Sequence, residues 1–125
     1  MIQIDSSGWL QHIQTILSAA ITVQDLLYHQ GYSVLVHCSD GWDRTSQIVS
    51  LTEMLLDPYY RTMVGFHVLV EKDWLDFGHQ FSTRCGHNGL NTNDDQRSPI
   101  FVLFLDCVYQ VGGQDDGWNP MPCFE

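Results

Sequence analysis

The sequence predicts an α/β chain that is mostly helical and contains one buried strand. Apolar residues recur at helical spacing in several stretches, whereas one short apolar run, 33–37, shows no alternation of polar and apolar residues. A short run of this kind, rich in β-branched residues, is typical of a strand covered on both faces. A loop and a further helix follow it directly, so we expect the strand to deliver that loop to the start of the helix.

Two helices are expected in the first half of the chain. The first is predicted at 8–29, where apolar residues recur three or four positions apart, and Gly31 ends it. The second begins at about Arg44 and is stopped by Pro58. The apolar positions that define the first helix are Trp9, Ile13, Ile16, Leu17, Ala20 and Leu27.

The segment 66–77 fits two kinds of structure. Its apolar pattern is compatible either with a helix or with a short strand at 67–70. We favour the helix because Val70 and Trp74 then share one face.

A loop and a last helix are expected near the end of the chain. Residues 86–97 are rich in Gly, Asn and Asp, which predicts an exposed loop. Ser98 and Pro99 form a good N-cap and first-position pair, which opens a helix that runs to about Gln110.

The predicted strand bears on the domain organisation. A strand buried on both faces needs neighbours on both sides, because its backbone groups must be hydrogen-bonded. The chain offers at most one other weak strand candidate, at 67–70. We therefore expect residues 1–111 to form part of a domain whose sheet extends beyond them, and residues 112–125 to form an irregular, divergent tail.

Composition excludes several classes of protein. A hydrophobic content of 44% over 125 residues is typical of one modest globular domain. The net charge of −10 argues against a nucleic-acid partner and against a polybasic membrane patch. The chain has no apolar stretch of transmembrane length, and residues 1–5 do not resemble a signal peptide, so we expect a cytosolic protein. The four scattered cysteines are then expected to be reduced thiols.

Residues 37–44, His-Cys-Ser-Asp-Gly-Trp-Asp-Arg, carry the main chemical signal. Five residues separate Cys38 from Arg44, in the loop between the expected strand and helix. Backbone amides in such a loop converge on one point and the helix dipole adds positive charge, which together favour a bound phosphate. The same field is expected to lower the pKa of Cys38, so that its thiolate is present at neutral pH.

Each loop residue has an expected role in phosphate chemistry. Cys38 would attack phosphorus to form a phosphocysteine, which water then hydrolyses, while Arg44 would clamp two phosphate oxygens. Asp43 is the nearest acid for the leaving group, and Asp40 is the second candidate. The other residues expected to contact the substrate or the thiolate are Ser39, Gly41, Trp42 and Thr45.

The string 36–47, Val-His-Cys-Ser-Asp-Gly-Trp-Asp-Arg-Thr-Ser-Gln, resembles the active-site signature of the myotubularin-related phosphoinositide phosphatases. The resemblance continues on both sides and covers residues 6–110. It is carried by Ser7-Gly8-Trp9-Leu10, Tyr59-Tyr60-Arg61-Thr62, Glu71-Lys72-Asp73-Trp74, Phe77-Gly78-His79, Arg84-Cys85-Gly86-His87 and Ser98-Pro99-Ile100-Phe101.

The resemblance implies the fold of the cysteine-dependent, protein-tyrosine-phosphatase-like phosphatases, here as the C-terminal part of the catalytic domain. It implies removal of the 3-phosphate from phosphatidylinositol 3-phosphate and the 3,5-bisphosphate without a metal or other cofactor. Asp43 would be the acid, and Arg84 would help residues 39–44 to bind the headgroup. The resemblance also implies a cytoplasmic protein, peripheral on endosomal-type membranes, that associates with itself or with related phosphatases.

Departures from the family pattern leave a second hypothesis about the function open. Gln80 lies where the family usually has a basic residue, and Gly112 and Gly113 lie where the family continues as helix. The family's amino-terminal lipid-binding domain and the front of its catalytic domain are also missing from the sequence. The alternative is therefore a non-catalytic binding or scaffold fragment. A protein tyrosine phosphatase is a weaker alternative, because Asp40 and Trp42 do not fit the loop of that family.

Histidines near the loop suggest two further roles. His79, Cys85 and His87 lie close together in sequence, but zinc would need a fourth ligand, so we prefer loop and packing roles for them and predict no metal. His37 precedes the nucleophile and is expected to order the loop through hydrogen bonds rather than to act as a base.

Overall fold

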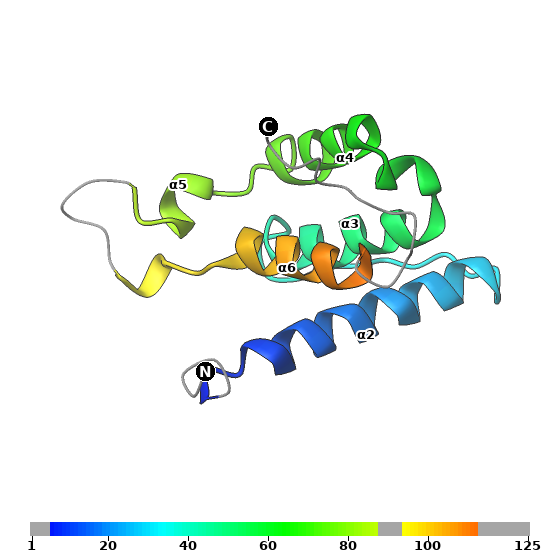
Figure 1. Ribbon diagram of the computed structural model, residues 1–125, viewed down its shortest axis with the longest axis horizontal. Coiled ribbons are helices and arrows are strands. Elements are labelled where there is room, and N and C mark those ends of the chain that lie inside the picture. Colours follow the sequence, from blue (N-terminus) through cyan, green and yellow to red (C-terminus); the bar gives the residue numbers. More distant parts are fainter. Residues whose placement is uncertain (1–5, 88–93, 113–125) are drawn as a thin grey trace.

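The computed structural model describes residues 6–87 and 94–112 of the chain. Four longer helices form its body: α2 (Trp9–Tyr28), α3 (Arg44–Leu56), α4 (Met63–Val70) and α6 (Ile100–Gly112). Figure 1 shows α3 and α6 between α2 on one side and α4 on the other, and α3 contacts both α2 and α6. The shorter elements are a 3-10 helix (Pro58–Arg61), a π-helical turn (Glu71–Leu75), α5 (Phe81–Arg84) and a second 3-10 helix (Asp94–Gln96).

The first two predicted helices are confirmed almost to the residue. α2 follows Gly8, whose φ of 74° lies in the left-handed region, and it ends at Tyr28, shortly before Gly31 with a φ of 68°. α3 begins at Arg44 and ends at Leu56, because Asp57 is extended before Pro58. The start of α3 at Arg44 places the end of the 38–44 loop in the first turn of a helix.

The helical interpretation of 66–77 is confirmed, and the short strand at 67–70 is wrong. The helix begins earlier than predicted, at Met63, because the Thr62 hydroxyl caps it by accepting a 3.0 Å hydrogen bond from the Gly65 amide. It continues from Val70 directly into the π-helical turn.

The helix predicted after Ser98 and Pro99 is confirmed as α6, which extends to Gly112. Part of the expected loop at 86–97 forms the short 3-10 helix at Asp94–Gln96. Residues 88–93 of that loop and residues 113–125 of the expected tail lie outside the described residues. The boundary between residues 1–111 and 112–125 therefore stays a prediction.

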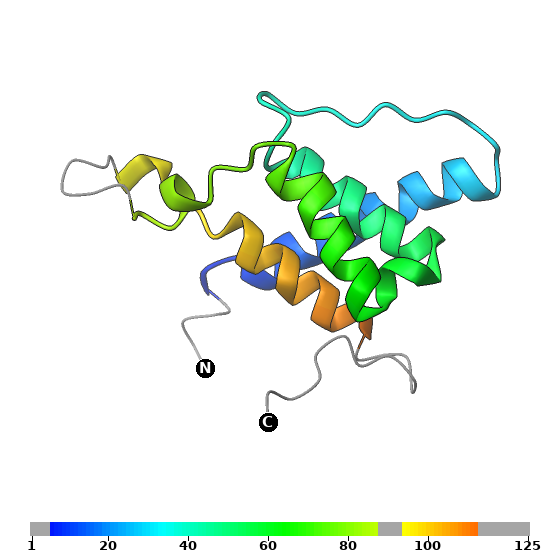
Figure 2. The same cartoon turned by 90° about the horizontal axis from the view of Figure 1, so that it is seen from above.

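The buried strand predicted at 33–37 is not observed. Within the part of the chain that the structure describes, no segment forms a strand, and the path from α2 to α3 is extended and lies apart from the helices (Figure 2). Leu35, expected in the core, is 87% exposed. The physical reason is that a strand is stabilised by neighbouring strands, and none of the described residues supplies one. The described part is thus mostly helical, as expected, without the strand of the α/β prediction.

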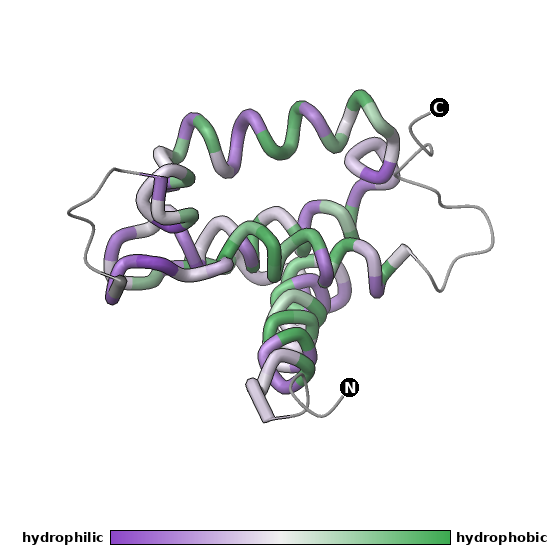
Figure 3. The backbone as a smooth tube through the Cα atoms, turned by 60° about the vertical axis from the view of Figure 1, so that its left-hand side comes forward, coloured by the Kyte–Doolittle hydropathy of each residue, from purple (hydrophilic) through white to green (hydrophobic). Residues whose placement is uncertain are grey.

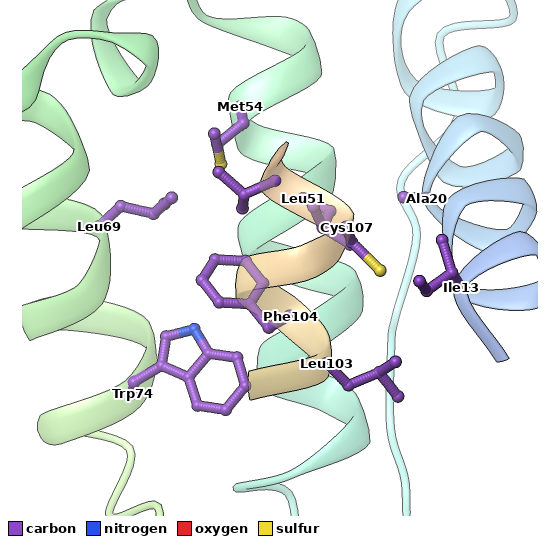
Figure 4. Close-up of a cluster of buried hydrophobic side chains, with 10 residues drawn as sticks. Ile13, Ala20, Leu51, Met54, Leu69, Trp74, Leu103, Phe104 and Cys107 are labelled. Atoms are coloured by element: carbon purple, nitrogen blue, oxygen red, sulfur yellow. The ribbon is translucent and has the colours of Figure 1, made fainter. Parts of the chain in front are cut away.

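The core lies between the four longer helices (Figure 4). Along the helices hydrophobic and hydrophilic residues alternate, as expected where one face of each helix is buried (Figure 3). Trp74 and Phe104 are fully buried, with ring centroids 4.9 Å apart. The buried hydrophobic residues are Ile13, Ala20, Leu51, Met54, Leu69, Trp74, Leu103, Phe104, Cys107 and Val108.

None of the described helices is long and apolar enough to cross a membrane. The described cysteines Cys38, Cys85 and Cys107 are free thiols.

Candidate active site

The loop from Cys38 to Asp43 curls back over its own first residue. Gly41 has a φ of 89°, a conformation that favours glycine, and its amide points at Cys38 with 3.2 Å between nitrogen and Sγ. The predicted glycine thus allows the loop to aim a backbone donor at the thiol. Arg44 then begins α3, so the thiol lies near the positive end of a helix.

The surroundings of Cys38 favour the charged form of its thiol. Partial burial acts to raise its pKa, but the hydroxyl of Thr45 and the amides of Thr45, Gly41 and Asp40 outweigh burial and lower the pKa to about 7. Thr45 is buried, and its hydroxyl makes no other hydrogen bond within the described residues. A substantial fraction of Cys38 is therefore thiolate at neutral pH, as the sequence predicted.

Arg44 reaches back over the loop. Its Nη2 donates a 3.1 Å hydrogen bond to the hydroxyl of Ser39, and that hydroxyl donates in turn to Oδ2 of Asp40 at 3.1 Å. Arg44 and Asp40 are both exposed. The guanidinium is thus already turned toward the loop and is exposed to solvent.

Asp43 is held by two basic side chains from a later part of the chain. Its Oδ2 lies 2.6 Å from Nη2 of Arg84, the last residue of α5, and its Oδ1 lies 2.8 Å from Nδ1 of His79. The side chains of Asp43 and Arg84 are 14% and 17% exposed, so water screens the pair only partly. Both oxygens of the predicted acid are therefore engaged.

Arg84 lies at the loop, where it forms an ion pair with Asp43, and its expected contact with the headgroup stays a prediction. Besides Asp43, its Nη1 donates to the carbonyl oxygen of Gln96 at 2.9 Å and to the side-chain oxygen of Gln96 at 3.2 Å. Gln80 is exposed and donates to the carbonyl oxygen of Gly78 at 2.9 Å. Positions 80 and 84 were both expected near the headgroup. Gln80 carries no charge, so Arg84 is the one of the two that brings a positive charge to the loop.

Trp42 contributes its backbone as well as its ring. Its carbonyl oxygen lies 3.0 Å from Nδ1 of His79. The indole is half-buried, and its Nε1 has no hydrogen-bond partner among the described residues. The backbone of Trp42 is thus anchored to His79, and the expected aromatic surface at the mouth of the site stays a prediction.

The contact of His79 with Asp43 and Trp42 was not predicted, because the sequence indicated only general loop and packing roles for this residue. Gly78, with a φ of 81°, turns the chain after the π-helical turn and directs the imidazole toward residues 42 and 43. The Phe77-Gly78-His79 motif was the available signal, since a glycine permits a sharp turn there, but it does not indicate which segment the ring faces. Within the described residues, no group of three His, Cys, Asp or Glu side chains could hold a metal, so His79 does not join Cys85 and His87 in a site. His37 is exposed, and its expected ordering role stays a prediction.

A cavity of about 500 Å³ adjoins Arg44 at the end of the loop. It lies between the first turns of α2, α3 and α6, and its walls are mainly apolar. Arg44 thus borders both the loop and this cavity. The lining residues are Ser7, Trp9, His12, Thr15, Ile16, Arg44, Gln47, Ser98, Pro99, Ile100 and Leu103.

Comparison with known proteins gives consistent matches over most of the chain. A family model described as "Myotubularin-like phosphatase domain" matches residues 1–116. The chain is 54% identical over 111 residues to "Myotubularin" from Xenopus laevis, covering 89% of the chain and 18% of that relative.

Two mammalian relatives extend the comparison. "Phosphatidylinositol-3,5-bisphosphate 3-phosphatase MTMR6" from Rattus norvegicus is 56% identical over 111 residues, which is 89% of the chain and 17% of the relative. "Phosphatidylinositol-3,5-bisphosphate 3-phosphatase MTMR4" from Mus musculus is 54% identical over 108 residues, which is 86% of the chain and 9% of the relative. The chain therefore spans less than a fifth of the length of these curated relatives.

Proposed function

The chain belongs to the family of myotubularin-like phosphatase domains, and from this premise we propose that it carries the catalytic loop of a phosphoinositide 3-phosphatase. The observation that carries the proposal is the Cys38 thiol, whose pKa is lowered to about 7 at the start of a helix that begins with Arg44. A thiolate beside a guanidinium suits nucleophilic attack on a phosphate monoester. The names of two relatives supply phosphatidylinositol 3,5-bisphosphate as a substrate, and the resemblance to the family adds phosphatidylinositol 3-phosphate.

The proposed reaction has two steps. In the first, Sγ of Cys38 forms a bond to phosphorus while the bond from phosphorus to the inositol 3-oxygen breaks, and Asp43 gives its proton to the departing oxygen. In the second, water attacks phosphorus while Asp43 takes a proton from it, the bond from phosphorus to Sγ breaks, and inorganic phosphate leaves with Cys38 restored as a thiolate. Arg44 binds two phosphate oxygens throughout, once it exchanges the Ser39 hydroxyl for the anion.

Asp43 must become free to carry a proton. In the structure its two oxygens are engaged by Arg84 and His79. A headgroup phosphate offers Arg84 another anion, and we propose that Arg84 moves to it when substrate binds. Residues 39–44 would then hold the 3-phosphate while Arg84 contacts the rest of the headgroup.

The proposed setting is the cytoplasmic face of endosomal-type membranes, where the phosphoinositide headgroup is the partner. Association with itself or with related phosphatases belongs to the same proposal. Both follow from the family, and the net charge of −10 means that a few placed cations rather than a general positive field would contact the membrane surface.

The second candidate function is a non-catalytic binding or scaffold role. The extended segment 33–37 favours it, because that segment leads directly to Cys38 and has no strand beside it within the described residues. A loop without a supporting strand would bind an anion less precisely than catalysis requires. Binding of phosphoinositide vesicles without turnover would select this alternative.

The proposed function is tested by phosphate release from short-chain phosphatidylinositol 3-phosphate. We expect release by the wild-type chain, and loss by at least about 100-fold in Cys38→Ser and Arg44→Ala. A vesicle-binding assay on the same three proteins separates catalysis from binding. Equal release by all three proteins would overturn the proposal.

A further inference from the structure

We propose that His79 is a positioning residue that fixes the orientation of the Asp43 carboxyl group and thereby decides which of its oxygens carries the transferable proton. This inference deepens the proposed function and rests on it. It starts from the two contacts of one imidazole nitrogen: Nδ1 of His79 lies 2.8 Å from Oδ1 of Asp43 and 3.0 Å from the carbonyl oxygen of Trp42.

Both partners of Nδ1 are hydrogen-bond acceptors. A carbonyl oxygen has no proton to give, so Nδ1 must carry the hydrogen, whether the ring is neutral or charged. Nδ1–H therefore donates toward both residues and joins the backbone of Trp42 to the side chain of Asp43. Oδ1 of Asp43 is thus occupied as an acceptor of His79. Arg84 now donates to Oδ2 at 2.6 Å and to Oδ1 at 3.4 Å, so Oδ2 is the oxygen that can hold a proton once Arg84 has moved away.

The His79 ring has little freedom to move. Its side chain is 1% exposed, and it lies edge-to-face against Trp74, 4.9 Å away, and Phe81, 4.6 Å away. Its backbone amide also donates to the carbonyl oxygen of Trp74 at 2.9 Å. Trp74 is itself fixed, because its Nε1 donates to the buried hydroxyl of Ser50 in α3 at 3.0 Å. The donor at Asp43 is therefore attached to the core of the protein.

Arg84 differs from His79 in this respect. Its long side chain belongs to a helix of only four residues and is 17% exposed, so it can exchange its contacts with Asp43 and Gln96 for another anion. When Arg84 leaves Oδ2 for a headgroup phosphate, His79 still holds Oδ1. The two basic residues then have separate tasks: Arg84 releases the oxygen that takes the proton, and His79 keeps that oxygen in place.

The test depends on the leaving group. A positioned acid accelerates departure of a poor leaving group such as the inositol alkoxide, and matters little for an aryl phosphate that leaves without a proton. We expect His79→Phe, which keeps a ring in the aromatic cluster but removes the donor, to lower the ratio of lipid to aryl phosphate kcat by about 10-fold or more. KM for the lipid should change far less, because the phosphate contacts of the loop remain.

A second variant separates positioning from packing. The amide nitrogen of an asparagine can occupy the place of Nδ1, so His79→Asn should recover part of the lipid activity that His79→Phe loses. The matched control is His67→Asn in α4, where His67 is exposed. An equal fall of kcat for the lipid and for the aryl phosphate in His79→Phe, or no fall of kcat for either substrate, would overturn the inference.

Nuclear magnetic resonance of the wild-type chain provides a readout that does not depend on turnover. We expect the imidazole of His79 to show a hydrogen-bonded Nδ1 proton that moves upfield in Asp43→Ala. A spectrum with the proton on Nε2 alone would overturn the inference even in an active protein. If the wild-type protein releases no phosphate from the lipid but shows the expected Nδ1 proton, the proposed function is wrong. The contact between His79 and Asp43 is then still supported.

Discussion

Nη2 of Arg84 lies 2.6 Å from Oδ2 of Asp43, which joins two residues that are 41 positions apart in the sequence. This ion pair, together with His79, attaches the 38–44 loop to the segment that follows the π-helical turn. The loop is therefore supported at its helical end, where Asp43 precedes the first residue of α3.

The ion pair between Asp43 and Arg84 should contribute measurably to stability. Since both side chains are largely buried, we expect a double-mutant cycle of Asp43→Ala and Arg84→Ala to give a coupling energy of about 0.5–3 kcal/mol. Urea unfolding of the four proteins measures it. Gln80→Ala paired with Asp43→Ala is the control, because Gln80 bonds to Gly78 instead, and this pair should be additive within about 0.5 kcal/mol. If the stability losses of Asp43→Ala and Arg84→Ala were also additive, the ion pair between these two residues would not hold the loop.

Alkylation of Cys38 should report its lowered pKa. Only the thiolate reacts with iodoacetamide, so the rate should rise with pH, pass its half-maximum near pH 7 and level off above it. Peptide mapping by mass spectrometry follows the rate at each cysteine. Cys107 serves as an internal control, since burial foremost and the neighbouring Asp106 raise its pKa to about 12, and it should stay unlabelled in the folded chain.

Thr45→Val should move the Cys38 titration upward. The substitution removes the hydroxyl that lowers the pKa and nearly preserves the shape of a buried side chain. At pH 7 the alkylation rate should then fall about twofold or more. An unchanged midpoint would mean that the backbone amides of the loop carry the effect alone.

The accuracy of the sequence analysis depended on how local each signal was. The ends of α2 and α3 were predictable because Gly8, Gly31 and Pro58 act on their own neighbours. The Cys38-to-Arg44 loop was predictable for the same reason, since the thiol, the glycine of the loop and the helical pattern that follows are neighbours in the sequence. The structure confirms that placement, with Gly41 turned so that its amide faces the thiol.

The features that were predicted wrongly or not at all depend on contacts between segments that are distant in the sequence. The apolar pattern at 33–37 describes the side chains of a strand, but a strand forms only where a second one pairs with it, and no such neighbour lies in the described residues. The contact between His79 and Asp43 likewise depends on how the region after the π-helical turn packs against α3. Nothing in the residues around position 43 indicates it, although the Gly78 turn is visible in the sequence.

Gly65→Ala should destabilise the protein although alanine is the better helix former. In an open helix this change would stabilise by up to about 1 kcal/mol. At Gly65, however, an added methyl group would lie against the carbonyl oxygen of Tyr59, well inside van der Waals contact, and a backbone atom cannot move aside easily. We expect a loss of about 1–3 kcal/mol in urea unfolding. The control is Val64→Ala, at an exposed neighbour in α4, and equal stability of both variants would contradict the close approach.

Leu69→Ala and Val68→Ala should differ sharply although the two residues are adjacent in α4. Leu69 is 0% exposed and belongs to the core cluster with Trp74 and Phe104, whereas Val68 is 39% exposed. Truncating Leu69 leaves a cavity lined by side chains that cannot fully collapse, so we expect a loss of about 2–5 kcal/mol in the free energy of unfolding. Val68→Ala should change it by no more than about 0.5 kcal/mol. Denaturation followed by tryptophan fluorescence measures both, since Trp74 reports on this cluster. Similar losses for the two variants would mean that α4 does not pack against α3 and α6 through its Leu69 face.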